Sequence, residues 1–259
     1  MAIAIAHLGQ SGFRLSLEDA VVYVDPYLSD YVEEIEGTHM RRLRPAPSRP
    51  ESITDASVVL VSHVHADHCD PLTLGPIARQ NPACVFVAPY EVVDLLDAKG
   101  IVPRARALVA GDDWLELPGG ISVLPVPAAH RDIVRNAHGQ AKCVGYAIRA
   151  GKHLLYHSGD TSVHPEIVAR LRAIGSIDLA MLPVNECNYY RERAGIVGNM
   201  SIREAFGLAD EIGARTVVPM HFDMFAPNCV FVEEIEAVYR HQRCGFRLKM
   251  PDDLTDALP

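Results

Sequence analysis

Three histidines and an aspartate fall within six residues of one another, at His63, His65, Asp67 and His68, directly after the apolar segment 56–61. That segment has the length of a buried strand, and the end of a strand is a rigid platform. His63 and His65 are two residues apart, so both rings can reach one cation while the chain stays extended. Asp67 and His68 follow where the chain turns, which suits a second cation or a supporting role beside the first. The run therefore predicts a metal site.

The ligand types indicate which ions such a site would take. Imidazole and carboxylate groups suit borderline or hard divalent ions such as zinc, manganese or iron, whereas a thiolate site would show paired cysteines. The six cysteines of the chain are scattered, without a C-x-x-C pair. Ordinary surface or core histidines are the alternative, but so many polar groups after a buried strand would be costly to desolvate without a ligand. We expect one or two divalent cations, zinc or manganese.

Three further candidate ligands each stand at the end of a short apolar, strand-like segment. They are His130 after segment 121–127, Asp160 at the end of segment 154–160, and His221 after segment 216–220. Gly159 lets the backbone next to Asp160 approach a cation closely. Most other histidines lack this context, although His7 ends the first strand-like segment and could line the same mouth. The sequence therefore supplies enough candidate ligands for a two-cation site with a bridging carboxylate.

Length and charge bound the class of protein. A chain of 259 residues can bury one large α/β core, so we expect one domain over residues 1–259. The formal charge of −9 argues against a nucleic-acid partner, which calls for a basic face. Residues 1–7 lack the cationic start of a signal peptide, and no run of about 18 apolar residues occurs. Scattered cysteines are typical of a reduced protein, so we expect a cytoplasmic location, no membrane partner and a possible homo-oligomer.

Strand-like and helix-like patterns alternate through both halves of the chain. A hairpin is predicted from 13–17 and 21–24, and it leads into Asp25-Pro26. Amphipathic helices are predicted at 71–80, 91–98, 164–173, 201–211 and 232–242. Ser201 and Glu204 fit a capping box at the start of the fourth helix. This alternation predicts an α/β protein.

A proline-stiffened basic segment, 38–50, lies between the early strands and the ligand run. It contains Arg41, Arg42 and Arg44. Guanidinium groups fit phosphate or carboxylate, so this loop is predicted to clamp an anionic group of a substrate. The alternative is a solvated or interface loop, since runs of charge are usually solvated.

The longest polar loop, 185–200, lies between a strand ending near Pro183 and the helix at 201–211. Its hydroxyl, amide and charged groups suit recognition of a hydroxylated anionic ligand, and they suit a subunit contact equally well. The candidate substrate contacts there are Glu186, Asn188, Tyr189, Arg191 and Asn199.

The ligand run and its partners resemble the metallo-β-lactamase superfamily, whose H-x-H-x-D-H signature falls on His63, His65, Asp67 and His68. The resemblance implies that the later ligands fall on His130, Asp160 and His221. Segments 7–13, 155–160, 177–180, 199–201 and 218–223 are most similar to the L-ascorbate-6-phosphate lactonase group. The resemblance spans nearly the whole chain.

That resemblance implies a four-layer αββα sandwich with the metals in a groove where two sheets meet. It implies that Asp25 supports a metal-bound histidine, the alternative being a turn-capping aspartate before proline. Asp223, at the end of the last matching segment, is a further expected substrate contact.

The expected activity is opening of the lactone ring of a sugar or sugar phosphate by a metal-bound hydroxide, with a small-molecule lactone as the partner. Asp67 is the expected catalytic residue, because it is placed to orient the nucleophile and carry its proton. One alternative is a phosphodiesterase acting on a small phosphodiester. Another is a non-hydrolytic metal-binding or redox protein.

Overall fold

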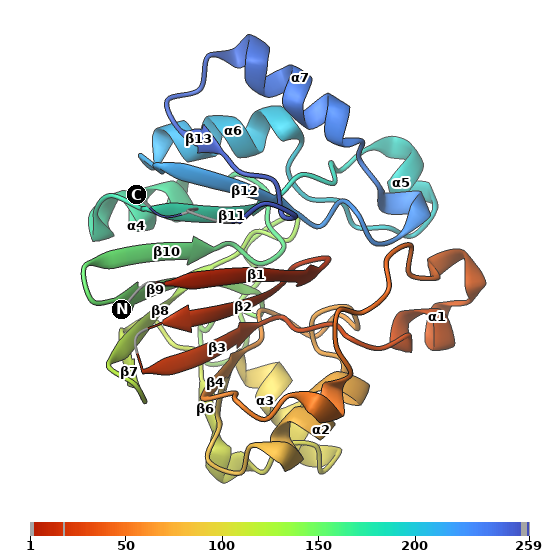
Figure 1. Ribbon diagram of the computed structural model, residues 1–259, viewed down its shortest axis with the longest axis vertical. Coiled ribbons are helices and arrows are strands. Elements are labelled where there is room, and N and C mark those ends of the chain that lie inside the picture. Colours follow the sequence, from red (N-terminus) through yellow and green to blue (C-terminus); the bar gives the residue numbers. More distant parts are fainter. Residues whose placement is uncertain (1–2, 18, 255–257, 259) are drawn as a thin grey trace.

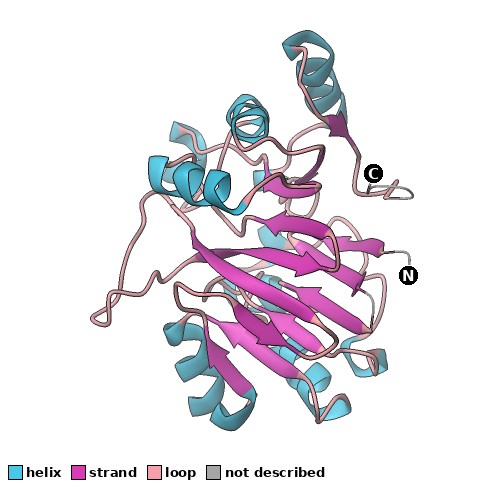
Figure 2. Ribbon diagram, turned by 90° about the vertical axis from the view of Figure 1, so that its left-hand side faces the viewer, coloured by secondary structure: helices cyan, strands magenta, loops and turns pink. Residues whose placement is uncertain are grey.

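The computed structural model describes residues 3–17, 19–254 and 258, and these residues form two β-sheets that pack face to face between outer helices (Figures 1 and 2). In the six-stranded sheet the first three strands are antiparallel, and β3 to β6 are parallel. Its order is β1 (Ala4–Gly9), β2 (Gly12–Leu17), β3 (Ala20–Val24), β4 (Val58–Leu60), β5 (Val85–Ala88) and β6 (Ala107–Val109).

The seven-stranded sheet is mixed as well. Strands β13 to β10 are parallel, and β10 to β7 are antiparallel. Its order is β13 (Arg247–Leu248), β12 (Thr216–Met220), β11 (Leu179–Pro183), β10 (His153–His157), β9 (Val144–Ala150), β8 (Ile121–Pro127) and β7 (Leu115–Leu117).

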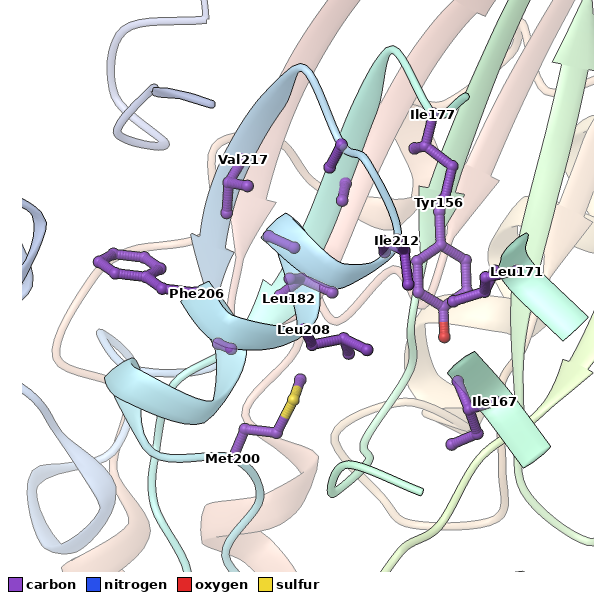
Figure 3. Packing of buried hydrophobic residues seen from close by; sticks show 14 of the residues in the cluster. Tyr156, Ile167, Leu171, Ile177, Leu182, Met200, Phe206, Leu208, Ile212 and Val217 are labelled. Carbon is purple, nitrogen blue, oxygen red and sulfur yellow. The ribbon is translucent and has the colours of Figure 1, made fainter. Parts of the chain in front are cut away.

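Three apolar layers hold these elements together. The central layer lies between the sheets and includes the fully buried Leu15, Tyr146 and Val218. A second layer lies between the six-stranded sheet and the helices α2 (Pro71–Gln80) and α3 (Tyr90–Ala98). A third joins the seven-stranded sheet to the helices α4 (Pro165–Ile174), α6 (Ile202–Glu211) and α7 (Val232–Gln242), where Phe206 and Leu208 of α6 pack toward the sheet (Figure 3). The predicted αββα sandwich is confirmed.

The predicted elements lie close to the observed ones. Helices α2 and α7 have the predicted bounds, α3 and α6 differ by one residue at one end, and α4 differs by one residue at both ends. The capping box is present, since the Ser201 hydroxyl accepts from the Glu204 amide while the Glu204 carboxylate accepts from the Ser201 amide. The hairpin of β2 and β3 is confirmed too.

Two short helices were not predicted from the sequence. Helix α1 (Tyr31–Glu36) precedes the basic segment, and α5 (Tyr189–Arg193) lies inside the polar loop 185–200. Both lie on the same side of the molecule (Figure 1). Within the described residues no helix is long and apolar enough to cross a membrane.

Candidate metal centre

The predicted ligands come together at the ends of strands from both sheets. The first run follows β4, whereas His130, Asp160 and His221 follow β8, β10 and β12. Parallel neighbours such as β10, β11 and β12 end at the same edge of a sheet, so Asp160 and His221, 61 residues apart in sequence, become neighbours. The side chains form groups whose ligand atoms lie within 4.8 Å of one another.

One group consists of three histidines. The Nε2 atom of His63 lies 3.0 Å from Nδ1 of His65, and Nε2 of His130 lies 3.2 Å from the same nitrogen. Nitrogens that each lie about 2.0–2.1 Å from one zinc ion would be separated by a little over 3 Å, so this spacing suits a divalent cation.

A second group contains Asp67, His68 and His221, and Asp160 lies beside it. One Asp160 oxygen is 3.3 Å from Nε2 of His68, and the other is 3.1 Å from Nε2 of His221. Asp67 Oδ2 is 3.2 Å from the same His221 nitrogen. Asp160 also groups with His63 of the first trio, so its carboxylate lies where it could bridge two cations.

Two buried polar atoms at the middle of this cluster make no hydrogen bond with the described residues. They are His68 Nε2 and Asp160 Oδ1, which lie 3.3 Å from each other as a charge contact without hydrogen-bond geometry. Buried nitrogen and oxygen atoms are almost always paired, and leaving them unpaired costs about 1–3 kcal/mol each. The two atoms point toward the same space and are standard ligands for zinc, manganese or iron, so the cluster fits a divalent cation.

Asp25, at the end of β3, supports the cluster from behind. Its Oδ2 lies 2.8 Å from Nδ1 of His68 and accepts a hydrogen bond of 2.6 Å from the Ser62 hydroxyl. Its Oδ1 accepts from the Ser62 amide at 2.7 Å. The bond to Nδ1 leaves Nε2 of His68 free for a metal. Of the two interpretations of Asp25, the structure supports the one in which it holds a histidine.

The backbone is strained where it carries these side chains. Asp25, Gln10 and His221 have φ angles of +42°, +56° and +61°. These values lie in the left-handed region that residues other than glycine seldom adopt. Such strain costs of the order of 1–3 kcal/mol per residue and clusters at functional sites. Next to Asp160, a Cβ on Gly159 would lie 2.6 Å from the Val144 carbonyl oxygen, so only glycine fits this turn.

Charges within the cluster shift the pKa values of its members. Burial lowers the pKa of His63 and of His130, which keeps these rings neutral. Burial acts in the same direction on His221, but the carboxylates beside it prevail and raise its pKa to about 9. Burial would raise the pKa of Asp67, yet the rings of His68 and His221 hold it well below its usual range. Asp67 is therefore ionised.

Gln10 is a site residue that the sequence did not single out. Its Nε2 donates a hydrogen bond of 2.7 Å to Oδ2 of Asp67 and lies 3.1 Å from Nε2 of His221. Its carbonyl oxygen accepts from the His221 amide at 3.0 Å and lies 3.2 Å from Nε2 of His7. His7, which was expected to line the mouth, thus contacts the site through Gln10.

The three arginines of the basic segment are bound by the protein itself. Arg41 pairs with Glu33 on the surface. Arg42 is half-buried, donates to the carbonyl oxygens of Tyr27 and Ser29, and lies over the Tyr27 ring. The expected anion clamp stays a prediction, which the positions of Arg41 and Arg42 do not favour.

Arg44 and Asp223 form part of a support for Gln10. Arg44 bridges Asp223 and Asp252, at 2.7 Å from each. The other oxygen of Asp223 accepts from the Gln10 amide at 3.3 Å. These contacts place Asp223 behind Gln10, and its expected contact with substrate stays a prediction.

Residues of the polar loop divide between its surface and its interior. Asn188 caps α5, and Tyr189 is 62% exposed and contacts Arg193. Arg191 donates to backbone carbonyl oxygens, one of them that of Glu186, and Asn199 is buried in a row of amides. None of these expected substrate contacts lines the pocket that contains Asp67 and His221, whereas Glu186 and Arg191 line a separate hollow of about 540 Å³. Their role in substrate binding stays a prediction.

The pocket above the metal cluster has a lining that is about equally polar and apolar. It has a volume of about 160 Å³, and His65, Asp67, Asp160 and His221 form its floor. No lysine or arginine of the described chain is among its lining residues. Its walls are Val32, Glu36, Met40, residues 195–197, Phe225 and Asn228.

The fold and this centre define a class of metal-dependent hydrolase, and comparison with known proteins agrees. The model of the family described as "Beta-lactamase superfamily domain" matches residues 21–222. A UPF0173 metal-dependent hydrolase of Cereibacter sphaeroides is 30% identical over 230 residues, which cover 85% of this chain and 86% of the relative. A UPF0173 metal-dependent hydrolase of Pyrococcus horikoshii is 26% identical over 234 residues, covering 90% and 91%.

Among solved structures, a possible metal-dependent hydrolase from Veillonella parvula has the same fold, with a TM-score of 0.74 at 16% identity over 97% of this chain and 98% of that one. The chain thus belongs to the metallo-β-lactamase superfamily and, within it, to the UPF0173 metal-dependent hydrolases. The narrower likeness to the ascorbate-6-phosphate lactonases stays a prediction.

Proposed function

We propose that this hydrolase opens the ring of a small, neutral lactone at a centre of two divalent cations, zinc or manganese. The observation that carries the proposal is the position of seven ligand side chains at a pocket whose described lining has no lysine or arginine. A phosphate or sulfate on the substrate would need such a partner. We therefore favour a neutral substrate over the sugar phosphate expected from the sequence.

Two cations, when bound, would polarise the ester carbonyl and lower the pKa of a coordinated water. Asp67 is suited to move the proton, because its carboxylate is ionised, lines the pocket and is 16% exposed. It would take the proton of the attacking water and give it to the ring oxygen as the acyl carbon–oxygen bond breaks. Gln10 would hold Asp67 in place through the 2.7 Å hydrogen bond.

A second hollow adjoins the pocket and suggests what the substrate carries. It has a volume of about 250 Å³ and shares Glu36 and His65 with the first. Its walls are mainly apolar: Tyr31, Ile35, Val64, Ala66, Cys69, Pro71, Leu95, Leu96 and Ile101, with Lys99. We propose that it takes an apolar substituent of the lactone.

The six cysteines are free. Free thiols support a cytoplasmic location, because they persist in a reducing compartment. We propose that the enzyme acts there on a small molecule, without nucleic acid or membrane; assembly into a homo-oligomer stays a prediction.

The test is a substrate panel on protein whose bound metal is assayed in the same preparation. The panel contains δ- and γ-lactones with alkyl substituents of increasing length, a sugar lactone with and without a 6-phosphate, and bis-p-nitrophenyl phosphate. We expect the highest kcat/KM for a neutral alkyl lactone. Fully metallated protein that hydrolyses only the phosphodiester, or hydrolyses nothing, contradicts the proposal.

A further inference from the structure

Three buried asparagines form a row of hydrogen-bonded amides that leads away from His221. Asn228 Nδ2 lies 3.4 Å from Nδ1 of His221, and Asn228 Oδ1 accepts from Asn185 at 3.1 Å. Asn185 Oδ1 in turn accepts from Asn199 at 3.0 Å. All three amides are at least 94% buried. The row starts at Nδ1 of His221, whereas the Asp67 and Asp160 oxygens lie beside Nε2. Nε2 of Gln10 also lies 3.3 Å from this Nδ1, but it can only donate, so Asn228 is the neighbour whose amide can turn an oxygen toward a proton on Nδ1.

A histidine that binds a metal through Nε2 carries its proton on Nδ1, and that proton needs an acceptor. An amide presents oxygen or nitrogen in nearly the same space, so it can turn end for end without moving its neighbours. With the three amides turned, Nδ1 of His221 donates to Asn228, Asn228 donates to Asn185, and Asn185 donates to Asn199. Each hydrogen bond between neighbours in the row can therefore form with either donor–acceptor direction.

The outer end of the row does not fix its direction. Oδ1 of Asn199 is buried and has no hydrogen-bond partner among the described residues. The direction is therefore set at the inner end, by which of the two ring nitrogens of His221 faces the cation position and which faces Asn228.

Arg191 holds the two segments that carry the row. Its guanidinium donates to the carbonyl oxygens of Asn185 at 2.5 Å, Glu186 at 2.9 Å and Cys229 at 2.8 Å. Because Cys229 follows Asn228, these bonds tie one amide of the row to the next. A Cβ on Gly198 would lie 2.3 Å from the Glu186 carbonyl oxygen, so the chain beside Asn199 approaches the same segment closely.

We propose that Asn228, Asn185 and Asn199 are positioning residues for His221. The row accepts the Nδ1 proton and fixes the ring so that Nε2 faces the second cation position, and Arg191 holds the row in place. The inference rests on the proposed metal centre but not on the proposed substrate.

The test measures binding of cobalt(II) to metal-free protein by its visible absorption, with total binding followed by equilibrium dialysis. Asn228→Leu removes the acceptor at nearly constant volume, and Asn228→Asp supplies a stronger one. We expect Asn228→Leu to weaken the binding step that involves His221 by about 10–100-fold, the usual effect of losing such a partner. Asn228→Asp should bind within a few-fold of the wild type.

A matched control separates positioning from a general loss of stability. Asn81 is another buried amide, bonded to Ile53 and Ile77 carbonyl oxygens at the end of α2. Asn81→Leu should lower the melting temperature without changing either cobalt affinity. Folded Asn228→Leu protein with wild-type affinity for both ions overturns the inference. If Asn228→Leu weakens cobalt binding as expected and the metal-loaded wild type hydrolyses no lactone, the positioning role stands and only the proposed substrate is contradicted.

Discussion

Asp67 differs from Asp160 in what its oxygens contact. Both line the pocket, and both oxygens of Asp160 face histidine nitrogens, whereas Asp67 also accepts a hydrogen bond from Gln10. A carboxylate held this way can bind a cation and still exchange a proton with substrate.

Changing Asp67 to Asn should therefore lower kcat by about 10²–10⁴-fold, the usual contribution of a positioned acid or base. The amide keeps an oxygen ligand, so the bound metal should stay close to the wild-type amount. Steady-state kinetics and metal analysis on one preparation check both. Turnover equal to the wild type would remove Asp67 from the chemistry.

Asp25 acts through His68. Replacing Asp25 by Asn keeps the shape but loses the charged acceptor at 2.8 Å from Nδ1. We expect metal affinity to fall by about 10–100-fold, because the partner that orients a ligand histidine is lost. Competition with a chromophoric chelator measures the affinity, and the melting curve shows whether the variant is folded. An unchanged affinity would mean that Ser62 alone orients the ring.

At the residue scale the sequence predicts most of the metal cluster and misses Gln10. The histidine spacing and the strand-end positions are local signals, so the ligands could be found without coordinates. Gln10 gives no such signal, because glutamine is common on surfaces and its partner Asp67 is 57 residues away. Arg44 and Arg191 were predicted to contact substrate from their position in the sequence. In the structure their guanidinium groups bind carboxylate and carbonyl oxygens of the protein itself, which local sequence does not reveal.

At the scale of elements, the turn after β10 sets the position of Asp160. Gly159 has a φ of +59°, and a Cβ there would lie 2.6 Å from the Val144 oxygen and 2.9 Å from Ser62 Cβ. Gly159→Ala should cost about 2–4 kcal/mol from strain and overpacking, and it should weaken metal binding by moving Asp160. Gly207→Ala is the control, because no atom lies within 4 Å of its Cβ and its exposed position in α6 gains about 0.5–1 kcal/mol in helix stability. Chemical denaturation with and without metal measures the stability of both variants. A Gly159→Ala variant as stable as the wild type would contradict the predicted strain at this turn.

Helix α1 forms a wall shared by the two hollows. Val32 and Glu36 line the pocket above the metal cluster, and Tyr31, Ile35 and Glu36 line the adjoining hollow. Ile35→Trp should fill that hollow. If two methylenes of the substituent are displaced, at about 0.8 kcal/mol each, kcat/KM for a long-chain lactone should fall about tenfold. The unsubstituted lactone should be unaffected.

Leu108→Trp is the matched control for Ile35→Trp. Leu108 is similarly exposed but lies on β6 and lines neither hollow. Equal loss of activity toward short and long substrates in Ile35→Trp would contradict the assignment of the second hollow.

A helix is predicted accurately when its own sequence contains enough turns of an amphipathic pattern. Helices α2 and α7 have ten and eleven residues with an amphipathic pattern, and their bounds were predictable. Helix α1 has six residues and only Val32 buried, so its pattern is too short to recognise. Its packing against Met40, Met224 and Phe225 brings together residues nearly 200 apart, which local patterns do not predict.

At the scale of the whole molecule, the centre joins the two sheets. Ligands from β4 of one sheet meet ligands from β8, β10 and β12 of the other. A bound ion therefore stabilises the folded chain, by about 2.7 kcal/mol at a concentration 100 times its Kd. Removing the metals with a chelator should lower Tm by roughly 5–10 °C, and adding zinc or manganese should restore it. An unchanged Tm would mean that the cluster does not hold an ion.

The most direct test of the central claim is a titration of metal-free protein with zinc or manganese, in which bound metal per chain and turnover of a neutral alkyl lactone are measured together. The account predicts that turnover reaches its maximum at two bound ions per chain and is lost again with chelator. Protein that binds two ions per chain and leaves the lactone intact, or that hydrolyses it without metal, would contradict it.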